Sequence, residues 1–348
     1  MTSHGTYPSS TYRIDRGTER TVQSGRSGFQ GVSGGGLDGQ EVRSLRGDSH
    51  LGRSKPWIRM LSSRARVAHE LICSIGPSEE RVFRVIESTR PNLLLVFKGE
   101  TFPWSVAKRA SRELGSSTVL WFPDDPRYLR SLLYPQAPFF DHVVTSSKPT
   151  SKMLETMGVS SSHIPFGCDP SIHCSAQLEP RYNVTFIGSY YPERARILSG
   201  LARNDIAIWG PYWNLPIVSR RLRKSVKHGE SHRERYVKLL NSSKISINIH
   251  NESDRAVGKV NMRVFETAGC GTFQLTEDST ELDEYFLKGK EVVPYGSQHE
   301  LCELVDYYLD NEEEREGIAL SAQQRAYRDH TYAHRVRLLL SHLGLAMC

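Results

Sequence analysis

The stretch RPNLLLVFKG (residues 90–99) decides the fold class of this chain. Residues 93–97 form a continuous apolar run, which is typical of a parallel strand buried on both faces. Working outward, the apolar spacing predicts helices at 79–88, 103–114 and 149–157, and further strands in STVLWFPDD (117–125), DHVVTSS (141–147) and HIPFG (163–167). Alternating strands and helices indicate a doubly wound parallel sheet.

The same alternation restarts after PFGCDPSIHCSAQLEP (165–180), an irregular segment that we interpret as an interdomain linker. The predicted strands are YNVTFIGS (182–189), DIAIWGPYW (205–213), KISINIH (244–250), TFQLTE (272–277) and EVVPY (291–295). The predicted helices are 192–202, 231–242, 260–269, 298–310, 312–328 and 332–343, with a basic irregular segment at 214–228.

Two α/β halves predict two Rossmann-like domains whose parallel sheets face each other across a cleft. We expect a disordered tail at 1–55, an N-terminal acceptor-side domain at 56–167, a linker at 168–180 and a C-terminal domain at 181–348. Ligands of open α/β sheets bind at the carboxyl ends of the strands. The residues that directly follow each strand are therefore the site candidates.

The basic charge is concentrated in the N-terminal segment. The formal net charge is +6, and residues 1–66 contain 11 Lys/Arg and 5 Asp/Glu, whereas the remaining 34 basic and 34 acidic residues cancel. A solvated arm is the favoured interpretation over an RNA or lipid contact, and no specific nucleic-acid partner is expected. No apolar stretch is long enough for a signal peptide or a membrane span, and the cysteines lack a CxxC pair. We expect a cytoplasmic protein without a metal site.

The segment GSYYPER (188–194) follows the first strand of the second half. Gly188 allows a ligand to approach the backbone, the following helix start can bind an anion, and Arg194 can pair with a diphosphate. An ordinary strand–helix corner with a surface arginine is the alternative. His250, at the end of KISINIH, is a further donor-side candidate because of its position.

The segment IWGPYWN (208–214) places Gly210 and several aromatic residues after the next strand. Trp209, Tyr212 and Trp213 could stack on a nucleobase, or they could form a hydrophobic plug between sheet and helix. The sequence leaves these two interpretations open.

The segment KVNMRVFETAGCGTFQLTE (259–277) is the most informative one. Asn261 is placed to cap a helix, and Arg263 and Glu266 lie three residues apart on one helical face. A carboxylate there can accept the hydroxyls of a ribose, and the arginine can balance a leaving diphosphate. The alternative is a simple Arg–Glu pair within the helix.

On the acceptor side, WFPDDP (121–126) ends a predicted strand in Asp124 and Asp125. One of them could orient an acceptor hydroxyl or act as the catalytic base, or it could cap the next helix. The sequence contains no DxD triplet, P-loop, GxSxG or HExxH motif.

With these segments in this order, the chain resembles the CgeB family of spore-maturation-protein-like glycosyltransferases. The resemblance spans most of residues 91–340 and rests on FPDDP (122–126), DHVVTSS (141–147), PFGCDPSIH (165–173), FIGSYYPER (186–194), IWGPYW (208–213), NMRVFETAGCGTFQLTE (261–277), LKGKEVVPY (287–295) and EEEREGIALSAQQRAYRDHTYAHR (312–335).

The resemblance implies a GT-B fold, a nucleotide-diphosphate-sugar donor held by the C-terminal domain, and no obligatory metal or other cofactor. Glu266 matches the carboxylate that grips the donor ribose, Asn261 and Arg263 match the same segment, and Gly188 and Arg194 match the phosphate-side loop. Two departures stand out. Many GT-B enzymes have a second Glu eight residues before the ribose Glu, where this chain has Gly258, and the usual N-terminal strand with its glycine-containing loop is not recognisable.

The sequence therefore predicts a glycosyltransferase that moves a sugar to the hydroxyl of a glycan, protein or small molecule. A non-catalytic GT-B-like protein that binds a nucleotide sugar or glycan is the alternative.

Overall fold

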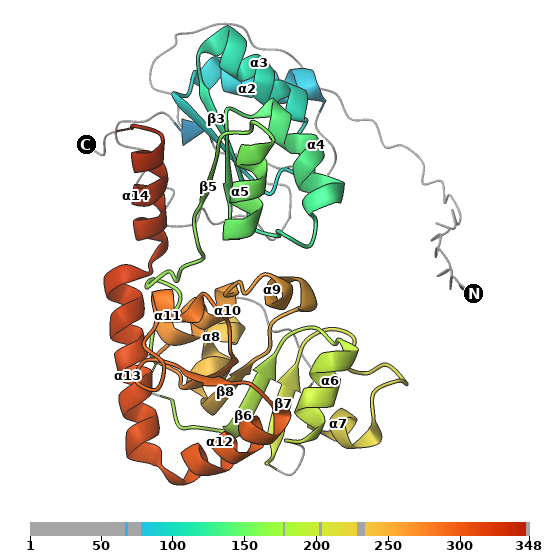
Figure 1. The fold of residues 1–348 in the computed structure, drawn as a ribbon, viewed down its shortest axis with the longest axis vertical. Coiled ribbons are helices and arrows are strands. Elements are labelled where there is room, and N and C mark those ends of the chain that lie inside the picture. Colours follow the sequence, from blue (N-terminus) through green and yellow to red (C-terminus); the bar gives the residue numbers. More distant parts are fainter. Residues whose placement is uncertain (1–66, 69–77, 177, 202–203, 228–233, 346–348) are drawn as a thin grey trace, which may run out of the picture. The chain divides into compact units, whose positions relative to one another are not determined.

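The computed structural model describes residues 67–68, 78–176, 178–201, 204–227 and 234–345. The tail expected at 1–55 lies outside the described residues. The described chain contains two five-stranded sheets in which all the strands run parallel (Figure 1). This confirms the predicted pair of α/β halves.

The strands of the first sheet follow one another in chain order, β1-β2-β3-β4-β5. Its elements are β1 (Val67–Ala68), α2 (Glu79–Thr89), β2 (Leu93–Phe97), α3 (Trp104–Leu114), β3 (Ser117–Phe122), the short turns η1 (Leu129–Leu133), α4 (Tyr134–Gln136) and η2 (Ala137–Phe139), β4 (His142–Thr145), α5 (Lys148–Thr156) and β5 (Ser161–His163).

The apolar run of β2 has a simple physical reason, because both faces of the first sheet are covered. Leu94 and Val96 pack with α2, α3 and α5 on one face. Leu93 and Leu95 point to the other face, where they pack with α14 (Tyr332–His342) from the end of the chain. Successive residues of a strand point to opposite faces, so a strand between two layers must be apolar throughout.

The second sheet has the order β10-β9-β8-β6-β7, so the chain moves from β6 to β7 on one side and then returns to β8 on the other. Its strands are β6 (Tyr182–Ile187), β7 (Ile206–Trp209), β8 (Ser243–Asn248), β9 (Gln274–Glu277) and β10 (Val293–Tyr295). Its helices are α6 (Pro192–Ser199), α7 (Arg220–Ser225), α8 (Glu234–Asn241), α9 (Glu252–Ala256), α10 (Met262–Gly269), α11 (Leu282–Tyr285), α12 (Gln298–Asp310) and α13 (Glu312–Asp329).

The predicted elements differ from the observed ones mainly where elements are short. The structure adds β1, which pairs with β2 through Val67 and Leu93, at a place where the sequence showed no strand. It also adds α7 inside the segment expected to be irregular, where Ser219 caps the helix by accepting from Leu222 N. Helices of four to six residues such as α7, α9 and α11 show too few turns for apolar periodicity to reveal them.

All described residues belong to one compact unit of the chain. The last helix, α14, joins the two halves, because Val336, Leu339 and Leu340 pack on the first sheet. At its start, Arg335 donates to the carbonyl of Phe166 over 2.8 Å.

Candidate functional site

The second sheet reverses its strand order between β6 and β8, and a cavity of about 330 Å³ lies at the carboxyl ends of these two strands. Such a switch point is where open α/β sheets bind ligands. The described residues that line the cavity are Arg127 from the first half, Tyr191, Pro192, Glu193 and Arg194 at the start of α6, and His250, Asn251, Glu252 and Ser253 after β8.

The start of α6 leaves backbone donors available to a ligand. Tyr191 is the N-cap residue, and its side chain makes no capping hydrogen bond. Pro192 occupies the first turn as expected, since it lacks an N–H group and has a suitable φ. The first N–H groups of a helix have no partner inside the helix and carry the positive end of its dipole. This end of the cavity therefore suits an anion.

Arg194, a half-buried cation, lies at this helix start. Its Nη1 donates to the carbonyl of Ser189 over 3.1 Å, and its Nη2 donates to the carbonyl of Ile249 over 2.9 Å. Burial lowers the pKa of the guanidinium, and the nearby charge of Arg263 acts in the same direction. Gly188 allows this approach, because a Cβ atom there would lie 2.9 Å from the Phe186 ring and 3.3 Å from Arg194 Nη1. Arg194 thus lines the cavity and Gly188 packs against it, and their role in donor binding stays a prediction.

His250 is a buried imidazole beside the cavity, and its side chain is almost without a partner. Its backbone N–H donates to Glu277 Oε2 over 3.0 Å. Neither ring nitrogen has a hydrogen bond among the described residues, and Nδ1 lies 3.8 Å from the same Glu277 oxygen. Burial, with the charges of Arg255 and Arg194, lowers the pKa of His250 to about 4, so the ring is neutral at pH 7. A neutral ring offers one donor and one acceptor to a ligand.

The sequence did not reveal Arg255, which ties the rim of the cavity together. Its Nε donates to Glu277 Oε1 over 2.7 Å, and its Nη1 donates to Glu193 Oε2 over 2.8 Å. Burial acts to lower the pKa of Arg255, but the hydrogen bonds that it donates to these two carboxylates raise the pKa overall. Glu277 is the last residue of β9, and its position at the end of a predicted strand was the signal that could have revealed it. Arg255 lies in the short α9 and gave none.

The segment around α10 is built as predicted, but its charged residues lie outside the set that lines the cavity. Asn261 caps the helix by accepting from Arg263 N over 3.0 Å. Arg263 Nη1 lies 3.1 Å from Glu266 Oε2, which is the intrahelical pair considered as the alternative. Glu266 is 6% exposed, and its other oxygen lies 3.6 Å from His173 Nε2 of the linker.

The aromatic residues after β7 are mostly internal. Trp209 and Trp213 are each 1% exposed, and Trp209 packs with Tyr236 and neighbouring apolar side chains. The structure therefore favours the hydrophobic plug over base stacking for both tryptophans, because a stacking platform needs an open face. Gly210 has a φ of 136°, and a Cβ atom there would lie 2.1 Å from the Gly188 carbonyl oxygen, so it serves backbone packing.

The two acceptor-side carboxylates have different surroundings. Asp124 is half-exposed and lies 2.6 Å from Lys98 Nζ, whose pKa is raised by this hydrogen bond although burial opposes it. Asp125 is 1% exposed, and its Oδ1 accepts from Ser146 N and Oγ. The structure therefore gives Asp125 a structural surrounding and leaves Asp124 as the accessible carboxylate.

Lys259, which the sequence did not single out, connects this acceptor-side loop to the second half. It is 2% exposed, and its Nζ donates to the carbonyls of Pro123 and Asp125. The same Nζ lies 3.8 Å from Asp125 Oδ1 and 3.6 Å from Asp254 Oδ1. A buried cation with two carboxylates and two carbonyls fixes the loop that also carries Asp124.

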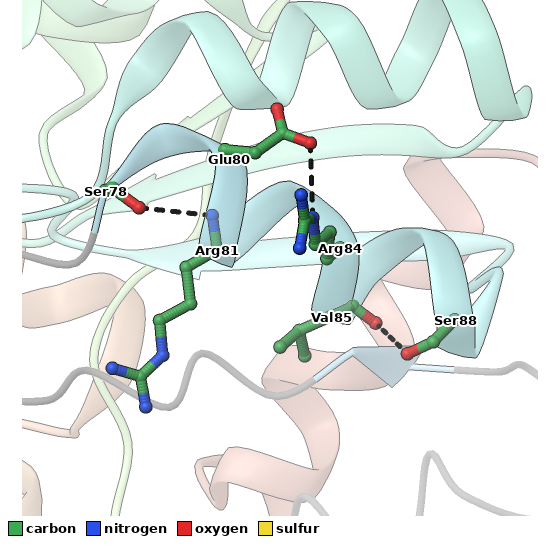
Figure 2. A pocket seen from close by; sticks show the side chains of 6 residues that line it. All are labelled: Ser78, Glu80, Arg81, Arg84, Val85 and Ser88. Atoms are coloured by element: carbon green, nitrogen blue, oxygen red, sulfur yellow. Dashed lines mark hydrogen bonds and ion pairs between the residues drawn. The ribbon is translucent and has the colours of Figure 1, made fainter.

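A second hollow lies on α2 and has a different character (Figure 2). Its described lining is Ser78, Glu80, Arg81, Arg84, Val85 and Ser88. These side chains form local helical contacts, such as Arg84 Nε to Glu80 Oε1 over 3.4 Å, and they are exposed to water. This hollow therefore offers no preorganised polar group to a ligand.

Two further features bear on the function. Within the ranges that the structure describes, no three His, Cys, Asp or Glu side chains gather in a way that could hold a metal ion. No helix among the described residues is both long and apolar enough to cross a membrane.

Comparisons with known proteins give a family match for the second half and similar folds for most of the chain. Residues 181–341 match the family described as glycosyl transferase-like, whereas no curated protein matches the sequence. HepE of Anabaena in complex with UDP-glucose is similar in structure, with a TM-score of 0.56, 13% identity and coverage of 76% of this chain and 81% of that one. A glycosyltransferase from Rickettsia africae has a TM-score of 0.54 and 12% identity, covering 80% and 84%.

A sucrose-phosphate synthase from Thermosynechococcus elongatus is also similar, with a TM-score of 0.52, 11% identity and coverage of 76% and 77%. At these identities the likeness concerns the fold, which is the predicted GT-B arrangement of two parallel α/β domains. Residues 181–341, which contain the whole second sheet and its cavity, match a family described as glycosyl transferase-like, and the chain has the GT-B fold.

Proposed function

We propose that this protein is a glycosyltransferase that binds a nucleotide-diphosphate sugar at the second sheet and transfers the sugar to an acceptor hydroxyl. One observation carries the proposal. The cavity at the switch point between β6 and β8 combines an uncapped helix start, the half-buried Arg194 and the ring of His250, whose nitrogens make no hydrogen bond among the described residues. Backbone donors, a cation and a neutral donor are the groups that a diphosphate with an attached sugar requires.

The chemistry follows from where charge develops. As the bond between sugar and diphosphate breaks, positive charge grows on the sugar ring and negative charge on the leaving diphosphate. Arg194, Arg263 and the N–H groups at the start of α6 would meet that negative charge, which is the most effective use of fixed donors in a site. This set of cations is our reason for proposing transfer without an obligatory divalent ion.

Glu266 and Asn261 would bind and orient the donor rather than take part in bond making. Glu266 already has two cationic or donor neighbours, Arg263 and His173, which fix its carboxylate in place. A fixed carboxylate can accept two ribose hydroxyls with little loss of its own freedom. We also propose that the chain is a member of the CgeB family, which its sequence motifs resemble.

On the acceptor side, Asp124 is the candidate base. It lies on the same turn as Arg127, whose Nη1 donates to Tyr191 Oη over 2.8 Å beside the cavity. Tyr128 N bonds to the carbonyl of Asp124 over 3.2 Å, which fixes this turn. An accessible carboxylate on a fixed turn is suited to accept a proton from an acceptor hydroxyl.

The test is a titration of the purified full chain with UDP, GDP, ADP and dTDP, each with and without EDTA, followed by thermal unfolding. A ligand at 100 times its Kd stabilises the folded state by about 2.7 kcal/mol. We expect one nucleotide to raise the melting temperature selectively and EDTA to leave that rise unchanged. HepE was solved with UDP-glucose, so UDP is the first nucleotide to try. No shift with any nucleotide would contradict the proposed donor, and a shift that EDTA abolishes would contradict metal independence.

A further inference from the structure

The segment after β7 carries a surface that the proposed donor site does not use. It comprises the loop at 211–219 and the helix α7, and we call it the β7–α7 surface (Figure 1). We propose that this surface docks the protein on bilayers that contain anionic lipids. The proposal does not depend on the proposed transfer reaction.

The loop exposes three large apolar side chains within six consecutive residues. Tyr212 is 63% exposed, Leu215 is 41% exposed and Ile217 is 72% exposed. No other stretch of six consecutive residues in the described ranges contains three exposed large apolar side chains. Scattered exposed apolar residues need no explanation, but a local group of them marks an interaction site.

This exposure is built into the fold, because the loop is firmly anchored. Trp213 and Val218 are buried between the exposed residues, and Trp213 Nε1 donates to the Gly188 carbonyl over 2.7 Å. Val218 N donates to the carbonyl of Leu215 over 3.0 Å, which closes the turn that presents Ile217. Trp213 and Val218 therefore hold the loop in place from inside the protein, while Leu215 and Ile217, which lie between them in the sequence, remain at the surface.

The charged side chains along this segment of the chain are all basic. From Asp205 to Glu230 the chain has no acidic residue in between. In α7 only Leu222 is buried, at 2% exposure. The basic residues of this segment are Arg220, Arg221, Arg223 and Lys224, which are exposed, and Lys227, which is half-buried. Basic residues beside exposed apolar ones are the combination that binds the interface of an anionic bilayer.

This combination favours lipid over the other partners of a basic surface. Nucleic acid would use the basic residues and the ring of Tyr212, but Leu215 and Ile217 are aliphatic, cannot stack on bases and would stay exposed to water. A second copy of this chain, docked through the same surface, would bring basic residues against basic residues. An anionic bilayer satisfies both parts, since its headgroups attract the basic side chains and its acyl region accepts the apolar ones.

The experiment is co-flotation of the full chain, without nucleotide, with vesicles of phosphatidylcholine alone or of phosphatidylcholine mixed with phosphatidylglycerol. We expect binding only to the mixed vesicles. Each apolar side chain that leaves water contributes about a tenfold gain in partitioning, so the variant Leu215→Ser/Ile217→Ser should bind at least about tenfold more weakly. The variant Arg220→Glu/Arg223→Glu should lose most of its binding, because it reverses the local charge.

Matched controls separate this surface from a general effect of removing exposed apolar side chains or reversing exposed basic ones. Leu320→Ser removes an exposed leucine from α13, and Arg81→Glu/Lys152→Glu reverses two exposed charges in the first half. Both controls should bind like the wild type. All the substituted side chains are exposed, and thermal unfolding will verify that each variant is folded.

Several results would overturn the proposal. They are equal binding to both kinds of vesicle, no binding to either, or wild-type binding by the β7–α7 variants, which would assign the binding to the N-terminal segment. Binding of single-stranded RNA that Arg220→Glu/Arg223→Glu abolishes, together with failure to bind vesicles, would make the surface a nucleic-acid site. Self-association abolished by Leu215→Ser/Ile217→Ser would make it an interface between copies.

Discussion

The two sheets of this molecule are alike in size and direction, yet only the second has a reversal of strand order. In the first sheet each strand lies next to its predecessor, and Lys98, Asp124 and Ser146, which follow its strands, pair with other protein groups. In the second sheet the reversal between β6 and β8 opens a cavity where Arg194 and His250 lie. In the proposed function, topology more than residue type decides which sheet holds the donor.

The comparison teaches how the halves divide the work in our account. The second half would bind the nucleotide sugar, and the first half would present a carboxylate. Lys259 links the two halves, because it precedes α10 in the second half and its Nζ donates to the carbonyls of Pro123 and Asp125 in the first half.

The largest effect is expected from Asp124→Asn on the first sheet. Loss of a general base typically lowers turnover by about 10²- to 10⁴-fold. Donor binding should remain unchanged, because Asp124 is assigned to the acceptor side. Steady-state transfer rates, with donor affinity measured by calorimetry, check this prediction. Full turnover in the variant would remove Asp124 from the mechanism, and no turnover in the wild type would favour a non-catalytic binding protein.

The second prediction concerns the connection between the halves. Lys259→Met would leave Asp125 and Asp254 buried without their cation, and burial already raises the pKa of Asp254. Removing one partner of such a cluster costs about 3–5 kcal/mol in unfolding free energy. Urea unfolding measures it. Adding Asp254→Asn should recover part of the loss, and a cost near zero for the single variant would show that Lys259 does not join the halves.

The third prediction compares one histidine from each half. Burial lowers the pKa of His250 to about 4, and burial with the charge of Lys148 lowers that of His163 to about 4 as well. Because both folded values lie below the unfolded value, each residue stabilises the fold above pH 6.5, and this contribution is lost as the pH falls toward 4.

For a fully buried group this loss amounts to about 3 kcal/mol, and for the less deeply buried His163 it should be smaller. Unfolding free energies between pH 7 and pH 4 should therefore fall less steeply in His250→Asn and in His163→Asn than in the wild type. Only His250→Asn should also weaken nucleotide binding at pH 7. An unchanged pH slope would contradict the buried neutral ring, and weaker nucleotide binding by His163→Asn would contradict the division between the sheets.

The smallest effect is expected from Lys148→Ala. Lys148 of the first half pairs with Glu284 of the second, but both side chains are almost half exposed. Exposed pairs contribute about 0–1 kcal/mol, and salt screens them. Urea unfolding of this variant is the natural partner of the Lys259→Met experiment. A cost as large as that of Lys259→Met would show that burial does not decide which contact holds the halves together.

Much of the fold could be predicted from the sequence, because its long elements have clear patterns. The run at 93–97 indicated a strand covered on both faces, and α2, α12 and α13 begin at the predicted residues. The order of the strands was not predictable, since periodicity says nothing about which strand neighbours which. Without that order, the cavity between β6 and β8 could not be placed.

The candidate site was predictable where residues follow strands and obscure elsewhere. Arg194 and His250, which were chosen because they follow strands, line the cavity, and their role in donor binding stays a prediction. Arg255 and Lys259 were not, because a charged residue in a short helix or loop has no distinctive pattern until its partners are known. Trp209 and Asp125 also follow or end a strand but are buried, so position after a strand does not by itself tell an exposed side chain from an internal one.

The most direct test of the account is the affinity of the full chain for the preferred nucleoside diphosphate, measured by calorimetry for the wild type, Arg194→Met and Lys98→Met. Arg194 lies in α6, which follows β6 of the second sheet, and Lys98 directly follows β2 of the first sheet. Loss of a charged hydrogen-bond donor costs about 1.5–3 kcal/mol, so Arg194→Met should bind roughly 10- to 100-fold more weakly. Lys98→Met should bind like the wild type. The opposite pattern, or equal affinities in all three proteins, would contradict a donor site at the switch point of the second sheet.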